Sequence, residues 1–312
     1  MVTKFNMKIS IIGAGNVGSF TAVRLAQEGI GEILLVDVVK GLAQGKAFDL
    51  EDARPILKYD YQIEGTDDIG KIKDSDIIII TAGLARKPGM SREELLNKNA
   101  QILKDICLNI KRLTPEAIII VVTNPLDLLT CLTLEITGFK SNKVFGMGIS
   151  LDSARFANLI SKKLNIPSTD IDACVIGSHS EAMLPLPRFT KIKGITLDEF
   201  LNDKEIEDLE NKTVNRGTEI VSLLGSGSAF FAPSAAIAEI TKTIVKDQKK
   251  TIGVCAYLDG EYDLKDICIG VPCRIGKNGI EKIIELDLDR EEKKKLINSA
   301  ETLRELIKQL PL

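Results

Sequence analysis

The feature that most constrains this chain is a glycine motif between a predicted strand and a predicted helix. The apolar run 8–12 predicts a strand, and Gly13-Ala14-Gly15-Asn16-Val17-Gly18 follows it directly. Apolar residues then recur at helical spacing, and a second apolar run, 32–36, ends at Asp37, 19 positions after the motif. A strand, a G-x-G-x-x-G turn, a helix and an acid after the next strand are together typical of a dinucleotide-binding unit.

Each part of the motif has a physical task. Gly13 permits the tight turn, Gly15 lets the backbone approach a pyrophosphate, and Gly18 lets the helix pack closely on the strand. Free N–H groups at the start of the helix attract phosphate. Asp37 would accept hydrogen bonds from the adenosine ribose and repel a 2′-phosphate, so NAD is favoured over NADP, a preference that Lys40 weakens. The alternative is a glycine turn that binds no ligand.

Predicted helices and strands continue to alternate along the first half. Helices are expected over 41–52 and 92–112, and strands over 76–80 and 117–122. Uninterrupted apolar strands are buried on both faces, which is typical of a parallel sheet between helix layers. The fold class is therefore α/β, with a doubly wound Rossmann sheet over residues 1–148 and a C-terminal α+β substrate domain over residues 149–312.

The second half predicts a mixture of elements. In order, we expect a helix over 149–164, a strand over 173–176, helices over 197–201, from 204 to 211 onward, 213–224 and 233–245, antiparallel strands over 251–257, 267–275 and 279–284, and a closing helix over 290–309. Thr196 and Glu199 have the spacing of a capping box before the first of the short helices.

Composition narrows the possible partners. Lys+Arg 41 against Asp+Glu 44 gives a net charge of −3, which suggests neither nucleic acid nor an anionic membrane as a partner. No apolar run approaches the roughly 20 residues that cross a bilayer, and residues 1–6 do not form a secretory signal. Six cysteines without C-x-x-C spacing and a single histidine argue against disulfides and a metal site, so we expect a cytoplasmic protein.

The single histidine, His179, follows the predicted strand 173–176. Its pKa, ordinarily about 6.5, suits proton transfer near neutral pH, and chemistry in α/β folds gathers beyond the carboxyl ends of strands. On the predicted helix 149–164, Asp152 shares the apolar stripe and Arg155 lies beside it. Either the two form a simple ion pair, or Asp152 orients His179 while Arg155 binds a substrate carboxylate.

Two further strand ends carry polar side chains. Arg86, Lys87 and Arg92 follow the strand 76–80 and form either a loop suited to an anionic substrate or a solvated basic loop. Asn124 precedes a proline at the end of the strand 117–122, which biases it toward extended geometry. We expect its amide to point into the cofactor cleft, beside the basic loop. The alternative for Asn124 is an Asx turn before a helix.

The chain resembles the lactate/malate dehydrogenase superfamily over essentially its whole length, most closely the malate enzymes that look like lactate enzymes. The motifs that carry the resemblance are the glycine motif, Leu84-Ala85-Arg86-Lys87-Pro88-Gly89-Met90-Ser91-Arg92, Val122-Thr123-Asn124-Pro125-Leu126-Asp127, Leu151-Asp152-Ser153-Ala154-Arg155 and Gly177-Ser178-His179. Ser180 departs from the pattern, because the family usually has glycine after this histidine.

This resemblance implies reversible, NAD-dependent oxidation of (S)-malate to oxaloacetate, as in the tricarboxylic acid cycle, by a homotetramer or homodimer. It assigns His179 as the proton acceptor and Asp152 as its partner. Arg92 would polarise the carbonyl and Arg155 would bind the carboxylate beside the reacting carbon.

The resemblance also implies further contacts to substrate and cofactor. Arg86 would bind the distal carboxylate of a four-carbon diacid, where lactate enzymes carry glutamine, and Asn124 would hold the reacting oxygen. The implied cofactor contacts are Gly13, Ala14, Gly15, Asn16, Val17, Gly18, Asp37, Asn99, Val122, Thr123 and Asn124.

Two other functions stay open. One is an L-lactate or other 2-hydroxy-acid dehydrogenase on the same scaffold, which Arg86 disfavours. The other is a non-catalytic NAD-binding sensor module, in which His179, Asp152, Arg92 and Arg155 would have no task.

Overall fold

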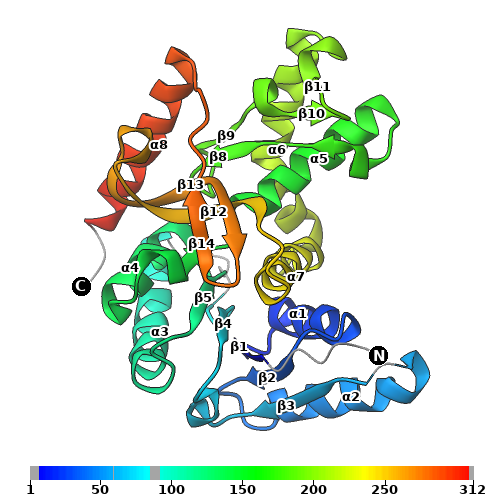
Figure 1. The fold of residues 1–312 in the computed structure, drawn as a ribbon, viewed down its shortest axis with the longest axis vertical. Helices are drawn as coiled ribbons and strands as arrows, with labels where there is room; N and C mark the ends of the chain where they lie inside the picture. Colours follow the sequence, from blue (N-terminus) through cyan, green and yellow to red (C-terminus); the bar gives the residue numbers. More distant parts are fainter. Residues whose placement is uncertain (1–6, 59, 85–91, 309–312) are drawn as a thin grey trace.

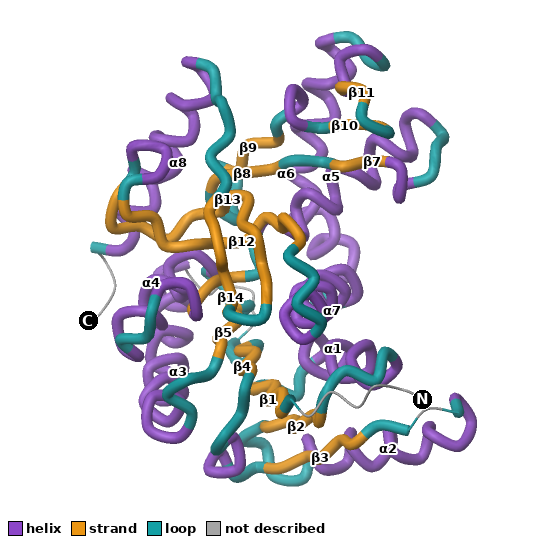
Figure 2. The backbone as a smooth tube through the Cα atoms, in the orientation of Figure 1, coloured by secondary structure: helices purple, strands orange, loops and turns teal. Residues whose placement is uncertain are grey.

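The computed structural model describes residues 7–58, 60–84 and 92–308, with the backbone alone for residues 92 and 93. An 11-stranded sheet runs through the described part in the order β3-β2-β1-β4-β5-β6-β12-β13-β8-β9, with β14 paired to β13. Figure 1 shows this sheet passing through the middle of the molecule with helices on both sides. Figure 2 shows the strands of the two halves of the chain meeting at its centre.

The first six strands form the parallel part of the sheet. They are β1 (Lys8–Ile12), β2 (Glu32–Val36), β3 (Gln62–Thr66), β4 (Ile77–Ile80), β5 (Ile118–Val121) and β6 (Val144–Gly146). The chain builds outward from β1 in one direction and from β4 in the other, so the strand order reverses between these two. Every residue of β4 and β5 is buried, as expected for strands covered on both faces. The predicted doubly wound parallel sheet is confirmed.

Four helices cover this part of the sheet. They are α1 (Asn16–Gln27), α2 (Leu42–Leu57), α3 (Arg92–Leu113) and α4 (Leu126–Thr137). Helices α3 and α4 lie on one side of the strands, while α1 lies on the other side against α7 (Phe231–Val245) (Figure 1). This arrangement places the loops after β1, β4 and β5 at one end of the sheet, where open α/β sheets bind their ligands.

The first half differs from the prediction in several features, and among them α4 and β6 were not predicted. Helix α2 continues to Leu57 instead of ending at Asp52, and it contains Pro55. Strand β3 was not predicted, because it pairs only with β2 and has just two buried residues, Ile63 and Thr66. Its Glu64 and Gly65 are residues that disfavour strands, so the run lacks the apolar signal of the central strands.

The second half extends the sheet with antiparallel strands and surrounds it with helices. Its main elements are α5 (Ile149–Leu164), β8 (Val175–Gly177), β9 (Met183–Pro185), α6 (Asp203–Leu224), α7, β12 (Lys250–Asp259), β13 (Lys265–Gly276), β14 (Gly279–Ile283) and α8 (Arg290–Ile307). A separate small sheet contains β7 (Ile171–Asp172), β10 (Lys191–Ile192) and β11 (Ile195–Thr196). The predicted antiparallel pairing of β12, β13 and β14 is confirmed.

The predicted start of the helical segment after residue 196 was wrong. Leu197–Glu199 is a single 3-10 turn, and the Thr196 side chain makes no capping hydrogen bond there. The capping box belongs instead to Asn202 and Glu205, whose side chains and backbone N–H groups bond reciprocally. From that cap a single helix, α6, covers both of the helices expected over 204–211 onward and 213–224.

The two halves share the larger of two hydrophobic clusters. Gly146 of β6 pairs with Cys255 of β12, so the antiparallel strands continue the parallel sheet without a gap. Buried residues of both halves belong to the same apolar cluster. Among the described residues, no helix has the length and apolar character needed to span a membrane.

Candidate active site

The glycine motif forms a close turn between β1 and α1. Gly13 has a φ of +111°, and a Cβ there would lie 2.6 Å from the backbone nitrogen of Ala82. A Cβ on Gly18 would lie 1.9 Å from the carbonyl oxygen of Gly13, so helix and turn could not pack as they do. A Cβ on Gly15 would meet nothing within 4 Å. Gly13 and Gly18 are therefore required by packing, whereas Gly15 leaves room for a ligand.

Charged side chains hold the peptide groups of Ala14. Its N–H donates to Asp37 Oδ2 at 2.7 Å, and its carbonyl accepts from Lys46 Nζ at 2.5 Å. Asn16 is exposed at the start of α1, and no side chain caps that helix. Val17 is half-buried. An exposed, uncapped helix start beside an open glycine fits the pyrophosphate of a dinucleotide, so these residues suit NAD.

The loops after β4 and β5 are joined by Asn99 on α3. Its side chain is 2% exposed, and its amide accepts from the Leu84 N–H at 2.8 Å and donates to the Asn124 carbonyl at 2.8 Å. Thr123 is buried and donates to the Ala82 carbonyl at 2.7 Å. Val122 is also buried. Asn124 is an exposed residue, so of these residues it is the one open to a ligand.

Two predicted substrate residues cannot be located. Arg86 lies outside the described residues. Arg92 begins α3, and its side chain lies outside what the structure describes. The loop that would carry both arginines leaves β4 at the same end of the sheet as the glycine turn.

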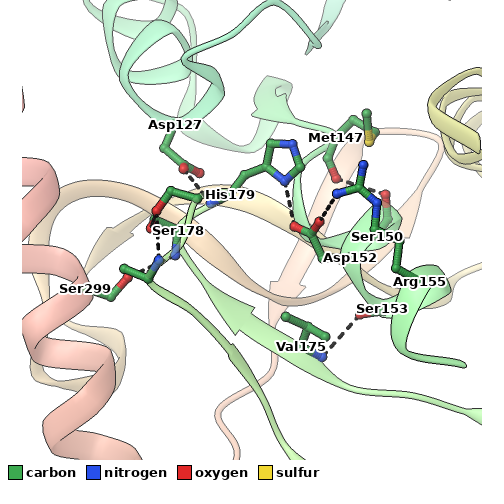
Figure 3. A network of polar contacts seen from close by, with 12 residues as sticks. Asp127, Met147, Ser150, Asp152, Ser153, Arg155, Val175, Ser178, His179 and Ser299 are labelled. Carbon is green, nitrogen blue, oxygen red and sulfur yellow. Dashed lines mark hydrogen bonds and ion pairs between the residues drawn. The ribbon is translucent and has the colours of Figure 1, made fainter. Parts of the chain in front are cut away.

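Three predicted residues, His179, Asp152 and Arg155, meet in one cluster (Figure 3). The Asp152 side chain is completely buried on the first turn of α5. Its Oδ2 lies 2.6 Å from His179 Nδ1, and its Oδ1 accepts from Arg155 Nη1 at 3.0 Å. Because a carboxylate accepts the proton on Nδ1, Nε2 is left to exchange a proton with a ligand. The side chains of His179 and Arg155 are each 12% exposed, which gives a ligand access to both.

The surroundings of His179 favour its protonated form. Burial alone lowers the pKa of the imidazole, but the Asp152 carboxylate, together with Asp127, outweighs burial and the opposing charge of Arg155. The pKa of His179 therefore lies above its ordinary value of 6.5. A histidine held in this way can keep or release a proton near neutral pH.

Sequence reasoning missed two residues that hold the His179 turn. The Asp127 carboxylate accepts the His179 backbone N–H at 2.7 Å, and Ser299 Oγ on α8 accepts the Ser178 backbone N–H at 3.1 Å (Figure 3). Asp127 had a signal, since it interrupts the apolar run Leu126-Asp127-Leu128-Leu129. Ser299 lies in a polar helix and had none. Ser180 pairs with Ser178 at 2.6 Å between hydroxyl oxygens, so serine after the histidine strengthens this turn.

Other chemistry has little support among the described residues. They contain no group of three or more histidine, cysteine, aspartate or glutamate side chains that could hold a metal ion. The six cysteines are unpaired, and burial raises the pKa of the Cys107 and Cys174 thiols to about 12. The cluster around His179 therefore provides the clearest centre for chemistry.

Comparison with known proteins agrees with this geometry. Residues 7–146 match the family model of the lactate/malate dehydrogenase NAD binding domain, and residues 149–311 match that of the lactate/malate dehydrogenase alpha/beta C-terminal domain. A protein of Methanosarcina mazei named malate dehydrogenase is 49% identical over 306 residues, which cover 98% of this chain and 100% of the relative.

Solved structures give the same result. The malate dehydrogenase of Cryptosporidium parvum has a TM-score of 0.95 and 38% identity, covering 98% of this chain and 99% of that one. The lactate dehydrogenase of Eimeria maxima with NADH and oxamate has a TM-score of 0.94 and 36% identity, covering 97% and 93%. Because both family models and these relatives match almost the whole length, the chain belongs to the lactate/malate dehydrogenase family of NAD-dependent oxidoreductases.

Proposed function

We propose that this chain is a malate dehydrogenase that catalyses the reversible, NAD-dependent oxidation of (S)-malate to oxaloacetate. The observation that carries the proposal is the bond between His179 Nδ1 and Asp152, with Arg155 on the other oxygen of the same carboxylate. The His179 imidazole and the Arg155 guanidinium lie side by side, and each side chain is 12% exposed. An acid/base group beside a guanidinium suits a substrate that has a hydroxyl next to a carboxylate. The similarity to proteins named malate dehydrogenase supports the same substrate.

The described residues suggest how the chain handles the proton. Neutral His179 takes the hydroxyl proton of malate at Nε2, and the buried Asp152 carboxylate stabilises the imidazolium that forms. Arg155 binds the carboxylate next to the reacting carbon, and Asn124 holds the reacting oxygen. Bound NAD⁺ would accept the hydride that leaves that carbon. In the reverse direction, protonated His179 returns the proton to the oxygen.

Two arginines complete the proposed substrate site. Arg92 stabilises the charge that grows on the reacting oxygen, and Arg86 binds the second carboxylate of the four-carbon diacid. Both assignments rest on the motif that these arginines share with the family. A one-carboxylate substrate would leave Arg86 without a partner, which is the basis of the proposed preference for malate over lactate.

Replacing Arg86 tests the substrate assignment. Arg86→Gln is expected to lower kcat/KM for oxaloacetate by at least about 100-fold, because an unpaired carboxylate in an enclosed site costs about 3–5 kcal/mol. Activity on pyruvate relative to oxaloacetate should rise. Lys87→Gln removes the adjacent cation and serves as the matched control. An unchanged preference in Arg86→Gln would contradict the assignment.

Consumption of NADH separates the candidate functions. Oxaloacetate should be the preferred substrate, pyruvate a poor one, and consumption without substrate should be absent. Preference for pyruvate would favour a lactate enzyme, a function named for one of the similar structures. NADH binding without turnover on any 2-oxo acid would favour a sensor module.

The remaining assignments concern organisation and cellular role. We place the boundary between the cofactor and substrate domains at residues 148 and 149, between β6 and α5, and support for this placement comes from the gap between the two family matches, 7–146 and 149–311. Six unpaired cysteines support a location in the reducing cytoplasm.

Exposed apolar residues on α2 support a homodimer or homotetramer. The reaction itself suggests a role in the tricarboxylic acid cycle.

A further inference from the structure

Asp127 is a buried carboxylate that contacts His179 through the main chain. It is the second residue of α4, directly after the loop that carries Asn124, and the residue is 4% exposed. Its Oδ2 accepts the His179 N–H at 2.7 Å across 52 positions of sequence (Figure 3). The bond therefore ties the end of β5 in the first half to the turn after β8 in the second.

Other hydrogen bonds also hold the His179 turn, but none of them involves the backbone N–H of His179. Ser299 holds the N–H of Ser178, and the Ser180 N–H donates to the Ser178 carbonyl at 2.8 Å. Asp152 holds the ring at Nδ1. Asp127 thus fixes the point from which the side chain leaves the backbone, while Asp152 fixes the orientation of the ring.

An ionised carboxylate in this position carries a desolvation cost. Among the described residues, Oδ1 of Asp127 is buried without a hydrogen-bond partner. Burial raises the pKa of Asp127 to about 6, against the opposing effect of His179. The other ionisable groups that face this carboxyl group are Asp152 on α5 and the Cys255 thiol on β12.

An acceptor for one N–H could be supplied by asparagine, which needs no ionised group in the core. Near neutral pH a carboxyl group with a pKa of about 6 is mostly ionised, so its charge reaches His179 from the side of α4. Asp127 and Asp152 both raise the pKa of His179, and Arg155 lowers it. The negative charge thus acts on the group that exchanges the proton.

We propose that Asp127 is a positioning residue for the reaction, which anchors the main chain at His179 and supplies a second negative charge that stabilises the imidazolium. The proposal rests on the proposed function of His179 as the acid/base group. It separates two roles of one side chain, the hydrogen-bond acceptor and the charge.

Two variants separate these roles. Asp127→Asn keeps an oxygen acceptor for the His179 N–H and removes the charge, whereas Asp127→Ala removes both. Asp127→Asn is expected to lower the pKa of His179 by about one pH unit, with KM for oxaloacetate changed by less than about 3-fold. Asp127→Ala is expected to lower kcat by a further factor of about 10 to 100, because the turn loses its anchor.

The single histidine allows a direct measurement. Because the chain contains one imidazole, its NMR titration reports the pKa of His179 without an assay of turnover. The same pH shift should appear in kcat/KM for oxaloacetate reduction. If the unmutated chain does not reduce oxaloacetate, the proposed function fails, yet the NMR titration of Asp127→Asn still decides whether Asp127 acts on the imidazole.

Thr137→Val on the same helix is the matched control. Thr137 is 2% exposed, and its hydroxyl donates within α4 to the Thr133 carbonyl at 2.7 Å, away from His179. This variant should leave the His179 titration and kcat unchanged. An Asp127→Asn titration identical to that of the unmutated chain would overturn the charge role. An Asp127→Ala variant with unchanged kcat would overturn the anchoring role.

Stability gives an independent readout. The pKa of Asp127 is higher in the folded chain than its ordinary value of 3.8, so the stability that its protonated form contributes is lost as pH rises through about 6. The urea midpoint of Asp127→Asn relative to that of the unmutated chain should therefore be higher at pH 8 than at pH 4. A carboxylate whose pKa is lowered by folding would give the opposite result, with Asp127→Asn relatively less stable at pH 8 than at pH 4.

Discussion

At the scale of single residues, Asp152 binds two partners, one through each oxygen of its carboxylate. Oδ1 accepts from Arg155 and Oδ2 from His179. The sequence left open whether Asp152 forms an ion pair within its helix or orients the histidine, and the structure shows both contacts together. Two such partners offset the cost of removing the fully buried Asp152 carboxylate from water. A single ion pair within the helix would not offset it at this depth.

The raised pKa of His179 predicts the pH dependence of the reaction. Oxidation of malate needs neutral His179, so its kcat/KM should rise with pH, and reduction of oxaloacetate needs the protonated form, so its kcat/KM should fall. Both midpoints should lie above 6.5, because Asp152 and Asp127 stabilise the imidazolium. Initial rates of both directions between pH 5 and about 9 test this, and a midpoint below 6.5 would contradict it.

Replacing Asp152 tests the contribution of its charge. Asp152→Asn should lower kcat by at least about 100-fold, because the amide neither stabilises the imidazolium nor fixes the proton on Nδ1. KM should change less, since the amide oxygen can still accept from Arg155. Ser153→Ala is a control on the same helix, where the hydroxyl accepts the Val175 N–H at 3.2 Å. A kcat within about 3-fold of the unmutated chain would show that Asp152 is not the histidine's partner.

Asp127 was missed for a physical reason. An acid in the first turn of a helix is ordinary, because it complements the helix dipole, so the position of Asp127 within an apolar run was not recognised as a sign of burial. Asp152, by contrast, stood out because it shares a stripe with apolar residues over a long, strongly periodic helix. Only the packing of α4 against the His179 turn shows that Asp127 faces inward.

At the scale of elements, sequence reasoning succeeded where the burial pattern was simple. The bounds of β1, β2 and α5 agree with the prediction, since each is a clean apolar run or a clear helical stripe. It failed at β3, a strand with one neighbour, and at α6, where a polar surface helix gave no continuous stripe. Tertiary packing, which sequence periodicity does not contain, decides both.

The glycine turn between β1 and α1 gives a prediction at this scale. Gly18→Ala should lower the melting temperature and weaken NADH binding, because its Cβ would lie 1.9 Å from the Gly13 carbonyl oxygen. Gly15→Ala should leave the melting temperature within about 2 °C, since the new Cβ meets nothing within 4 Å and φ is −66°.

The same Gly15→Ala variant should bind NADH at least about 10-fold more weakly, because the added methyl group occupies space proposed for the pyrophosphate. Thermal unfolding without ligand and NADH fluorescence titration measure the two effects separately. Unchanged NADH affinity in Gly15→Ala would mean that the cofactor does not approach this turn.

At the scale of the whole molecule, one helix presents apolar side chains that the chain itself does not cover. Phe48 and Ile56 of α2 are 64% and 81% exposed. In the proposed homo-oligomer, such residues would be buried against a second copy.

Charge on this face should prevent association. Phe48→Lys combined with Ile56→Lys is expected to reduce the mass measured by light scattering at least two-fold, because the introduced charges would be buried without partners. Ile195→Lys, at a 51% exposed apolar site on β11, should not change the mass. An unaltered mass in the double variant would place the contact between copies elsewhere.

The pairing of Gly146 with Cys255 means that the boundary between the two family matches lies inside one hydrogen-bonded sheet. If the chain were cut after residue 148, β6 and β12 would each have unpaired backbone N–H and C=O groups and newly exposed apolar side chains. Neither piece would then be a self-sufficient folding unit. The cofactor half and the substrate half should therefore fold and unfold together. The two family matches are separate units of sequence similarity, but they are not separate units of folding.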